Sequence, residues 1–372
     1  MNIALLEPYF TGSHAAWARD YARYSRHRVQ IFSLPGRFWK WRMHGGAVTL
    51  ARRFLASGFR PDLLLATDML DLTTFLALTR RQTGDIPAAI YFHENQLSYP
   101  WSPNDRDVRQ NRDRHYGFIN YASALAADAV FFNSRYHLDS FLAELHRFLK
   151  HFPDCNELET VPAIRQKARV LPLGLELTAL DACRPASAGR TGKPALILWN
   201  HRWEYDKNPA DFFRALEILA GQGLEFEVAV LGENFRQKPE EFLRAEQSLG
   251  RRVVQMGYAA SLAEYAAWLW QADLLPVTSV QDFFGISVMQ AIYCHCYPLL
   301  PDRLAYPELI PADLHARHLY RDFDDLLQRL AAAITGIDAV RQYSLRHVAA
   351  AYRWEAMAPR YDAEFERVAT GS

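Results

Sequence analysis

The sequence contains little cysteine, no long apolar run and no leader-like start. Four Cys among 372 residues are too few for a disulfide framework, and the spacing of Cys294 and Cys296 is poor for a zinc site. No apolar run approaches the roughly 18–20 residues that a membrane span needs. Residues Met1 to Pro8 lack the basic region and the cleavage site of a signal peptide. These absences predict a soluble, reduced, cytoplasmic protein without a membrane span, and no metal is expected.

The chain as a whole also lacks net charge, although its two halves do not. The 42 Lys and Arg balance 42 Asp and Glu, which by itself argues against a polyanion partner. Residues 1–175, however, hold 22 Lys and Arg against 16 Asp and Glu, a net of +6, and the remainder carries −6. Ten basic residues and one acid, Asp20, lie between Arg19 and Arg60. This stretch predicts a polyanion-binding surface, with a solvated helix face as the alternative.

Length and apolar patterning predict two domains of the same class. In the first half, short apolar runs alternate with amphipathic stretches, which is typical of a parallel sheet with helices on both faces. The expected strands are Asn2–Leu6, Val29–Ser33, Leu63–Thr67, Ala88–Phe92, Ala129–Phe132 and Val170–Gly174. The expected helices are Ser13–Ser25, Leu50–Ser57 and Asn120–Ala127.

The alternation restarts after Ala182–Pro194, a segment rich in Ala, Gly, Ser and Pro that is typical of a linker. The expected strands are Ala195–Trp199, Phe226–Leu231, Val253–Met256, Leu274–Val277 and Tyr297–Leu300. The expected helices are Ala210–Ala220, Leu262–Gln271, Ile286–Tyr293, Asp324–Thr335, Ala339–Ala350 and Trp354–Val368. The prediction is an α/β fold with two Rossmann-like, doubly wound domains facing across a cleft, where open α/β sheets bind ligands.

Polar residues follow the strands of the first half. Gly12 and Ser13 open a helix whose N–H groups suit an anion, with a plain helix cap by Thr11 and Ser13 as the alternative. His93 directly follows a buried strand and suits acid–base or hydroxyl-orienting chemistry, with a structural histidine as the alternative. Asn133 is placed likewise. The loops match neither G-x-G-x-x-G nor a P-loop, which disfavours a nicotinamide dehydrogenase or a phosphate-loop kinase.

Two loops of the second half carry a donor-binding pattern. Arg202 and Lys207 lie on a loop that opens a helix and suit a diphosphate, with surface salt bridging as the alternative. Asp282 precedes a turn at Gly285 and can accept hydrogen bonds from sugar hydroxyls. The N–H groups after the turn can hold a phosphate or a sugar ring. The predicted ligand contacts here are Phe284, Gly285, Ile286, Ser287 and Gln290.

Aromatic and basic residues interleave between Gly36 and Arg42. Bases can stack on Trp39 and Trp41 while neighbouring cations contact phosphates, with core packing of both Trp as the alternative. The predicted nucleic-acid contacts are Arg37, Lys40 and Arg42, with Arg109, Arg112 and Arg114 from a second basic stretch. The triplet Asp105–Asp107 is more typical of a solvated loop than of a metal site.

Four segments resemble the tRNA-queuosine alpha-mannosyltransferase family. They are Glu7–Trp17 (EPYFTGSHAAW), Phe92–Pro100 (FHENQLSYP), Asn200–Pro209 (NHRWEYDKNP) and Phe283–Pro307, which contains FFGISV and PDRLAYP. The loop Gln281–Gln290 is similar to the acid-x7-acid segment of retaining family-4 glycosyltransferases with the GT-B fold. Asp282 and Gln290 depart from the Glu that is usual at both positions. The likeness extends over nearly the whole chain.

The resemblance implies a domain organisation and a reaction. Residues 1–175 form an acceptor-binding domain, 176–352 a sugar-nucleotide-binding domain, and 353–372 a helix that crosses back to the first domain. The implied reaction moves mannose from GDP-mannose to a hydroxyl of queuosine in tRNA, with retention and without a metal or other cofactor. Arg202 and Lys207 bind the diphosphate, and Asp282 binds the sugar. Gln290 takes the ribose-binding position, Gly12 lies near the diphosphate, and His93 lies near the reacting sugar.

Two other interpretations stay open at this point. The first is a family-4-like glycosyltransferase whose acceptor is a lipid, a glycan or a metabolite. The second is a non-catalytic module that binds a sugar nucleotide or RNA, and its support is the departures at Asp282 and Gln290. The oligomeric state is left open as well.

Overall fold

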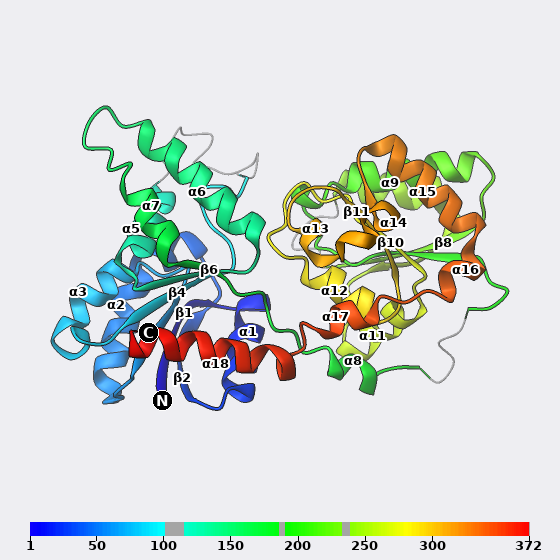
Figure 1. Cartoon of the computed structure of the whole chain (residues 1–372). Helices are drawn as coiled ribbons and strands as arrows, with labels where there is room; N and C mark the ends of the chain where they lie inside the picture. Colours follow the sequence, from blue (N-terminus) through cyan, green and yellow to red (C-terminus); the bar gives the residue numbers. More distant parts are fainter. Residues whose placement is uncertain (101–114, 186–189, 233–238, 372) are drawn as a thin grey trace. The chain divides into compact units, whose positions relative to one another are not determined.

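The computed structural model describes residues 1–100, 115–185, 190–232 and 239–371, and the chain divides into two compact units (Figure 1). Unit 1 comprises Met1–Leu175 and Trp354–Ser372, and unit 2 comprises Glu176–Arg353. Within the described residues, each unit is built on one six-stranded sheet. Among those residues, no helix combines the length and the apolar character needed to cross a membrane.

The sheet of unit 1 has the strand order β2-β1-β3-β4-β5-β6, and its neighbouring strands pair in parallel. Its strands are β1 (Asn2–Phe10), β2 (Arg28–Pro35), β3 (Leu63–Thr67), β4 (Ala88–Phe92), β5 (Ala129–Phe132) and β6 (Ala168–Val170). Its helices are α1 (Gly12–Tyr24), α2 (Trp39–Ser57), α3 (Leu72–Thr83), α5 (His115–Ala126), α6 (Arg135–Lys150), α7 (Thr160–Lys167) and α18 (Trp354–Thr370).

Both faces of this sheet are covered by helices. Side chains alternate between the faces along a strand, so Ala4 and Leu6 of β1 pack into a core with α2, α3, α5, α6 and α7. Ile3 and Leu5 point to the opposite face and are fully buried as well. In Figure 1, α1 and α18 lie on that opposite face. Strands buried on both faces explain the continuous apolar runs in the sequence.

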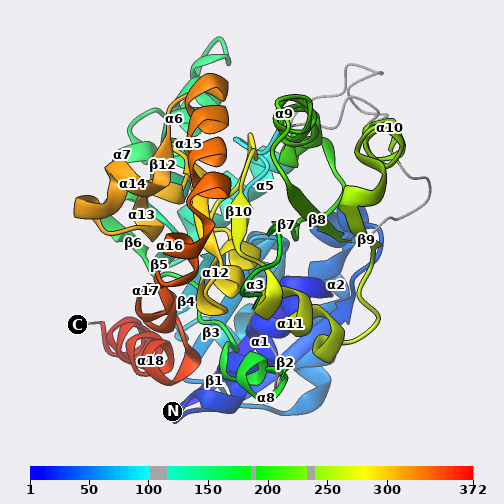
Figure 2. The same cartoon turned by 90° about the vertical axis from the view of Figure 1, so that its right-hand side faces the viewer.

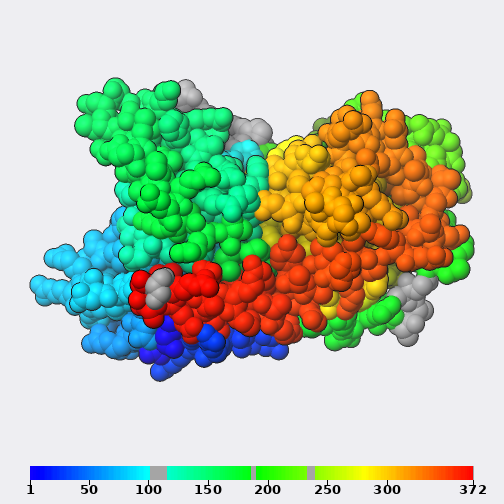
Figure 3. Space-filling view, in the orientation of Figure 1, coloured from blue at the N-terminus to red at the C-terminus, as the bar shows by residue number. Residues whose placement is uncertain are grey.

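The last helix, α18, belongs to unit 1 although it ends the chain. The Tyr361 hydroxyl donates to the Tyr91 hydroxyl of β4 (2.9 Å) and accepts from Trp17 Nε1 of α1 (3.2 Å). The Asp362 carboxylate is 2% exposed and accepts hydrogen bonds from the Tyr21 hydroxyl, the Ser25 hydroxyl and the Arg26 N–H. The outer side of α18 forms part of the surface of unit 1, shown in red in Figure 3.

The sheet of unit 2 repeats the plan with the order β12-β11-β10-β7-β8-β9, again in parallel. Its strands are β7 (Ala195–Trp199), β8 (Phe226–Leu231), β9 (Val253–Gly257), β10 (Leu274–Pro276), β11 (Tyr297–Pro301) and β12 (Leu319–Tyr320). Its longer helices are α9 (Pro209–Gly221), α10 (Glu240–Leu249), α11 (Leu262–Gln271), α12 (Ile286–Tyr293) and α15 (Phe323–Thr335). Shorter elements are α8 (Thr178–Ala182), η1 (Tyr205–Lys207), η2 (Gly250–Arg252), α13 (Tyr306–Leu309), η3 (Ala312–Leu314), α14 (His315–His318), α16 (Ile337–Arg341) and α17 (Arg346–Ala350).

Helices also cover both faces of the second sheet. Apolar side chains of α9, α10 and α15 form one core with alternate residues of β7 and β8. In Figures 1 and 2, α11, α12 and α17 lie on the other face. The predicted doubly wound α/β fold is thus confirmed in each unit.

Several predicted boundaries in unit 1 are wrong. The first strand does not end at Leu6 but continues to Phe10, because β1 keeps pairing with β2 up to Phe10 and Pro35. Helix α2 begins at Trp39 rather than at Leu50, so both Trp of the aromatic–basic run lie on a helix. The strand expected at Val170–Gly174 is Ala168–Val170; Pro172 lacks the N–H that would continue the pairing. Helices α3 and α6 had not been predicted.

Two predictions for unit 2 also change. The segment Ala182–Pro194 lies inside unit 2 and does not separate the units, which divide at Leu175 and Glu176. Of this segment, residues 186–189 are outside the described part. The helix expected over Ala339–Ala350 is two short helices, α16 and α17, that are separated by a non-helical stretch.

Replacing Asp362 tests how strongly α18 holds unit 1 together. Asp362→Ala removes the common acceptor of two hydroxyls and one N–H, which leaves buried donors unpaired. We expect a loss of about 3 kcal/mol in the free energy of unfolding, measured by urea denaturation. Glu355→Ala, an exposed acid in the first turn of the same helix, is the control and should cost less than about 0.5 kcal/mol. Equal effects of the two substitutions would contradict this role of Asp362.

Candidate active site

Buried polar side chains gather at one edge of the first sheet. All carboxyl ends of parallel strands lie at the same edge, and β1, β3, β4 and β5 are neighbours there. Glu7 lies in the last part of β1, while Asp68, His93 and Asn133 directly follow β3, β4 and β5. Each of the four is at most 9% exposed. The sequence had predicted His93 and Asn133, and the fold adds the two carboxylates.

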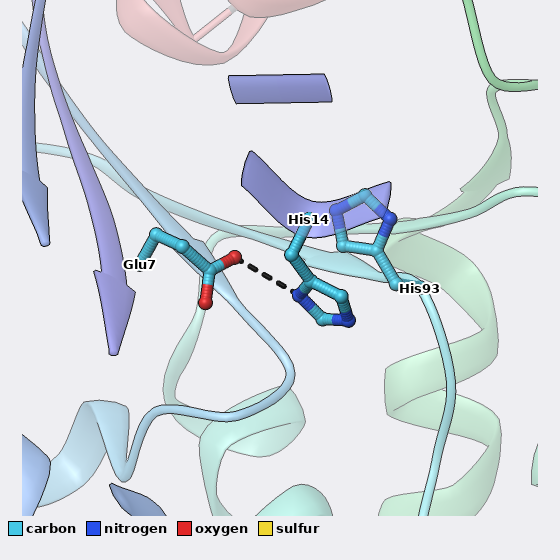
Figure 4. Close-up of side chains that lie close together, drawn as sticks. All are labelled: Glu7, His14 and His93. Carbon is cyan, nitrogen blue, oxygen red and sulfur yellow. Dashed lines mark hydrogen bonds and ion pairs between the residues drawn. The ribbon is translucent and has the colours of Figure 1, made fainter. Parts of the chain in front are cut away.

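Glu7 and His14 form a buried ion pair (Figure 4). Glu7 Oε2 lies 3.0 Å from His14 Nδ1, and Glu7 Oε1 accepts the Tyr9 N–H at 2.7 Å. Burial by itself would lower the pKa of His14, but the Glu7 carboxylate, assisted by Asp68 and Glu94, raises it to about 9. His14 is therefore an imidazolium at neutral pH.

His93 is held through its backbone and its ring. Its N–H donates to Asp68 Oδ1 (2.9 Å), and its carbonyl accepts from Asn133 Nδ2 (3.0 Å). Its ring centroid lies 4.4 Å from that of His14 and 4.7 Å from that of Trp17. Burial, followed by the charge on His14, lowers the pKa of His93 well below its usual value. His93 is thus a neutral imidazole beside a charged one.

Asp68 was missed by the sequence analysis. Burial raises the pKa of its carboxyl to about 8, with Glu94 adding to the rise and His14 opposing it. A protonated Asp68 still accepts the His93 N–H through its carbonyl oxygen. The sequence did hold a signal, since a charged residue directly follows the wholly buried strand β3.

The spacing of a metal-ligand set is found in one group of side chains among the described residues, Glu7, His14 and His93. One atom from each lies within 4.8 Å of the others. A divalent ion binds neutral imidazole, so it would have to displace the proton of His14. The pKa of about 9 opposes this at neutral pH. The group is better described as an ion pair next to a histidine, and the expected absence of a metal stays a prediction.

The first turn of α1 lies beside this group. Gly12 has a φ of +50° and begins the helix, and Thr11 at the N-cap makes no side-chain capping hydrogen bond. Thr11 thus takes the N-cap position of the plain-cap alternative, but without the side-chain hydrogen bond of a cap. Thr11, Gly12 and Ser13 are exposed. The N–H groups of the first turn are available to an anionic ligand.

In unit 2 the structure brings Lys207 and Asp282 together. Lys207 Nζ donates to Asp282 Oδ2 (3.2 Å) and to the Gln281 carbonyl (2.9 Å), and it lies 3.2 Å from Asp206 Oδ2. Burial opposes both charges, yet each partner keeps the other ionised: the pKa of Asp282 is lowered and that of Lys207 is raised. Two residues predicted separately, from different loops, thus form one charged pair.

Arg202 is placed differently from Lys207. Its guanidinium side chain is 51% exposed and lies 3.1 Å from Glu204 Oε1. Its positive charge is near enough to Lys207 to oppose part of the rise in the pKa of Lys207 that Asp282 and Asp206 cause. The predicted cationic pair is therefore one surface guanidinium beside one buried ammonium.

The turn at Gly285 presents the start of α12. Gly285 has a φ of +95°, a conformation that favours glycine, and its N-cap position carries no side-chain cap. The Tyr306 hydroxyl donates to Asp282 Oδ2 (3.1 Å), which fixes the acid at this turn. Ser287 lies in the first helical turn, and Gln290 Oε1 accepts from the Tyr265 hydroxyl at 2.9 Å. The Phe284 side chain is buried against Tyr352, so only its backbone is placed to contact a ligand.

Three further side chains of unit 2 were not predicted. Asn200 Oδ1, His201 Nε2 and Gln281 Nε2 are buried and have no partner in the described part of the chain. Burial, followed by the charge on Lys207, lowers the pKa of His201 to about 3, and its Nδ1 lies 2.9 Å from the Ser287 hydroxyl. Unsatisfied buried groups around a charged pair are what a polar ligand would satisfy. The signal in the sequence was their position directly after a buried strand or before Asp282.

The predicted nucleic-acid residues lie partly in the described structure. Arg37 is exposed, Lys40 lies 5.4 Å from the Trp39 ring centroid, and Arg42 Nε donates to the Pro35 carbonyl. Trp41 is exposed, whereas Trp39 packs on the Met43–Met69–Tyr116 cluster, so the core-packing alternative holds for Trp39 alone. Arg109, Arg112, Arg114 and the triplet Asp105–Asp107 lie outside the described residues.

Solved structures share the fold of this chain. A sucrose-phosphate synthase from Thermosynechococcus elongatus has a TM-score of 0.72 at 15% identity, with both chains wholly covered. The HepE protein of Anabaena, solved with UDP and glucose, has a TM-score of 0.67 at 14% identity, again over both whole chains. The lipopolysaccharide outer core galactosyltransferase WaaB has a TM-score of 0.62 at 13% identity, over 100% of this chain and 99% of that one. These likenesses show the GT-B fold.

Sequence comparison identifies the family. The N-terminal domain of the tRNA-queuosine alpha-mannosyltransferases matches residues 2–175. A tRNA-queuosine alpha-mannosyltransferase of Drosophila melanogaster is 33% identical over 336 residues, which cover 88% of this chain and 86% of that protein. The chain is therefore a glycosyltransferase with the GT-B fold and belongs to the tRNA-queuosine alpha-mannosyltransferase family.

Proposed function

We propose that this protein transfers mannose from GDP-mannose to a hydroxyl of queuosine in tRNA, in the cytoplasm. The Drosophila relative carries that acceptor and that sugar in its name. The observation that carries the proposal is the contact between Lys207 and Asp282 in a member of this family. It joins a cation suited to a diphosphate to an acid suited to sugar hydroxyls.

The donor is held mainly by unit 2 in this proposal. Arg202, Lys207 and the first-turn N–H groups of α12 bind the diphosphate and stabilise the charge that builds on it as it leaves, without a metal. Asp282 accepts hydrogen bonds from the sugar hydroxyls, and Gln290 contacts the nucleotide ribose. Ligand hydroxyls and phosphate oxygens satisfy the buried atoms of Asn200, His201 and Gln281.

Unit 1 completes the reaction with His93 and the start of α1. The neutral ring of His93 orients a substrate hydroxyl, Asn133 holds the His93 backbone, and the N–H groups at Gly12 and Ser13 suit a phosphate. The transition state is oxocarbenium-like. Attack comes from the face that the diphosphate leaves, and the departing phosphate takes the proton of the acceptor hydroxyl, which retains the configuration.

The basic residues of unit 1 provide the tRNA surface. Ten cations lie between Arg19 and Arg60, and one of them, Arg26, is paired with Glu366 of α18. Arg37, Lys40 and Arg42 on and before α2 contact phosphates, and the exposed Trp41 offers a ring to a base.

Donor and acceptor are tested together. We expect incubation with a panel of sugar nucleotides and queuosine-containing tRNA to add one hexose to queuosine with GDP-mannose, detected by mass analysis of the nucleosides. EDTA should leave the rate unchanged because the leaving charge is stabilised by protein groups. Release of GDP without a hexose on queuosine would point to another acceptor. Binding of the donor without release of GDP would contradict catalysis.

The diphosphate role is tested at Arg202. This side chain is exposed, so Arg202→Ala removes a cation without leaving a buried charge unpaired. We expect the turnover number to fall by about 10²-fold while the protein stays folded. Arg251→Ala, an exposed arginine elsewhere in unit 2, serves as the matched control and should change turnover less than about 2-fold. Near-normal turnover of Arg202→Ala would disprove the role.

The tRNA surface is tested by salt dependence. The variant Arg37→Ala/Lys40→Ala/Arg42→Ala should bind tRNA more weakly and lower the slope of log affinity against log salt by about one for each lost phosphate contact. The KM for the sugar nucleotide should not change. Arg80→Ala/Arg81→Ala on α3, which removes two exposed cations of the same unit, is the control. An unchanged slope of log affinity against log salt in the triple variant would show that tRNA binds to another surface.

A further inference from the structure

The ion pair between Glu7 and His14 lies directly against His93 (Figure 4). The two imidazole rings are 4.4 Å apart between centroids and tilted by 42°. Glu7 is fully buried, and both histidines are more than nine-tenths buried. No other charge pair of the described residues is in ring contact with His93.

The imidazole ring of His93 has a buried nitrogen without a hydrogen-bond partner among the described residues. Its Nε2 is buried and lacks a partner within the described ranges, while its backbone is bonded on both sides, to Asp68 and Asn133. A neutral imidazole offers one accepting nitrogen, whereas an imidazolium offers only donors. The protonation state of His93 therefore decides whether it can accept a hydrogen bond from a hydroxyl.

The groups around His93 favour the neutral ring. Positive charge comes from His14 on α1, and His137 on α6 adds a second histidine to the same surroundings. Burial raises the pKa of the nearest carboxyl, Asp68, which weakens the negative charge that would favour a proton on His93. The charged or titratable groups that face His93 or its neighbours are His14, Glu7, Asp68, Tyr91, Glu94, His137 and Tyr361.

We propose that His14, held by Glu7, is a positioning residue that keeps His93 a neutral imidazole, so that His93 accepts a hydrogen bond from a substrate hydroxyl. The identity of that hydroxyl rests on the proposed function, but the effect of His14 on His93 does not. Glu7 acts one step further away: it keeps the proton on His14. His14 disfavours a proton on His93 because a protonated His93 would be repelled by the imidazolium of His14.

The alternative is that the pair only stabilises the start of α1. A simple loss of either residue does not separate the two roles, because the remaining partner becomes an unpaired buried charge. The variant Glu7→Gln/His14→Gln removes both charges and keeps side chains that can hydrogen-bond to each other. It isolates the effect of the charge on His93.

The direct test is an NMR titration of His93 in the protein without substrates. We expect the wild-type ring to titrate well below the usual pKa of histidine, and the double variant to titrate about one pH unit higher than wild type. In the transfer assay, the acidic limb of kcat/KM against pH should move in the same direction. His93→Asn should remove that limb and assign it to His93.

The matched control is His27→Gln. His27 is also a buried histidine paired with an acid, Glu366, at 3.2 Å, but it precedes β2 and lies at the opposite edge of the sheet from His93. The His27→Gln variant should lose about as much stability as the double variant and leave the titration of His93 unchanged. A His93 midpoint that is the same in the double variant and wild type would overturn the proposal, as would a wild-type midpoint near 6.5. Absence of transfer to tRNA by wild type would instead overturn the proposed function alone.

Discussion

Each unit buries an ion pair among the loops that follow its strands, and the neighbouring polar side chains of that unit depend on the pair. In unit 1 the pair is Glu7 with His14, and in unit 2 it is Lys207 with Asp282. Burying a charge is costly unless a partner and further hydrogen bonds compensate it. Both pairs meet this condition, since Tyr9 donates to Glu7 and Tyr306 donates to Asp282. The charges of His14 and Lys207 then add to burial in keeping the neighbouring histidines neutral.

The two pairs act on neighbouring histidines in the same way. His14 lowers the pKa of His93, and Lys207 lowers the pKa of His201, in each case after burial as the larger cause. A neutral histidine at the end of a buried strand can accept a hydrogen bond, which suits it to substrate hydroxyls. Parallel sheets make such arrangements easy to build because every strand delivers its next residue to the same edge.

The overall charge balance has a functional basis. The zero net charge is the sum of a basic first half and an acidic second half. The proposed tRNA surface draws on the excess of cations in the first half. In the acidic second half, Lys207 lies between two acids that maintain its charge, and Arg202 stays at the surface. A single number for the whole chain conceals this division.

The sequence determined more of the fold than of the site. Apolar runs placed Leu63–Thr67, Ala88–Phe92 and Ala129–Phe132 without error, because strands buried on both faces must be apolar throughout. The start of α2 at Trp39 was missed, because its first turn is polar and aromatic and lacks a helical apolar period. Helices α3 and α6 were also missed, although the buried residues of α6, from Leu138 and Phe141 to Leu145 and Leu149, recur with a helical period. The apolar pattern of the sequence therefore predicts most accurately the strands that are buried on both faces.

The sequence by itself also determined the family and indicated the candidate loops, since motif residues are contiguous in the chain. It named Lys207, Asp282 and His93 singly. Only the tertiary structure decided that Lys207 contacts Asp282, which is 75 residues away in the chain. It also decided that Asp68, which follows β3, accepts a hydrogen bond from the backbone of His93, which follows β4. Protonation states were likewise beyond the sequence, because burial and the distance to the nearest charge set a pKa, and both exist only once the chain has folded.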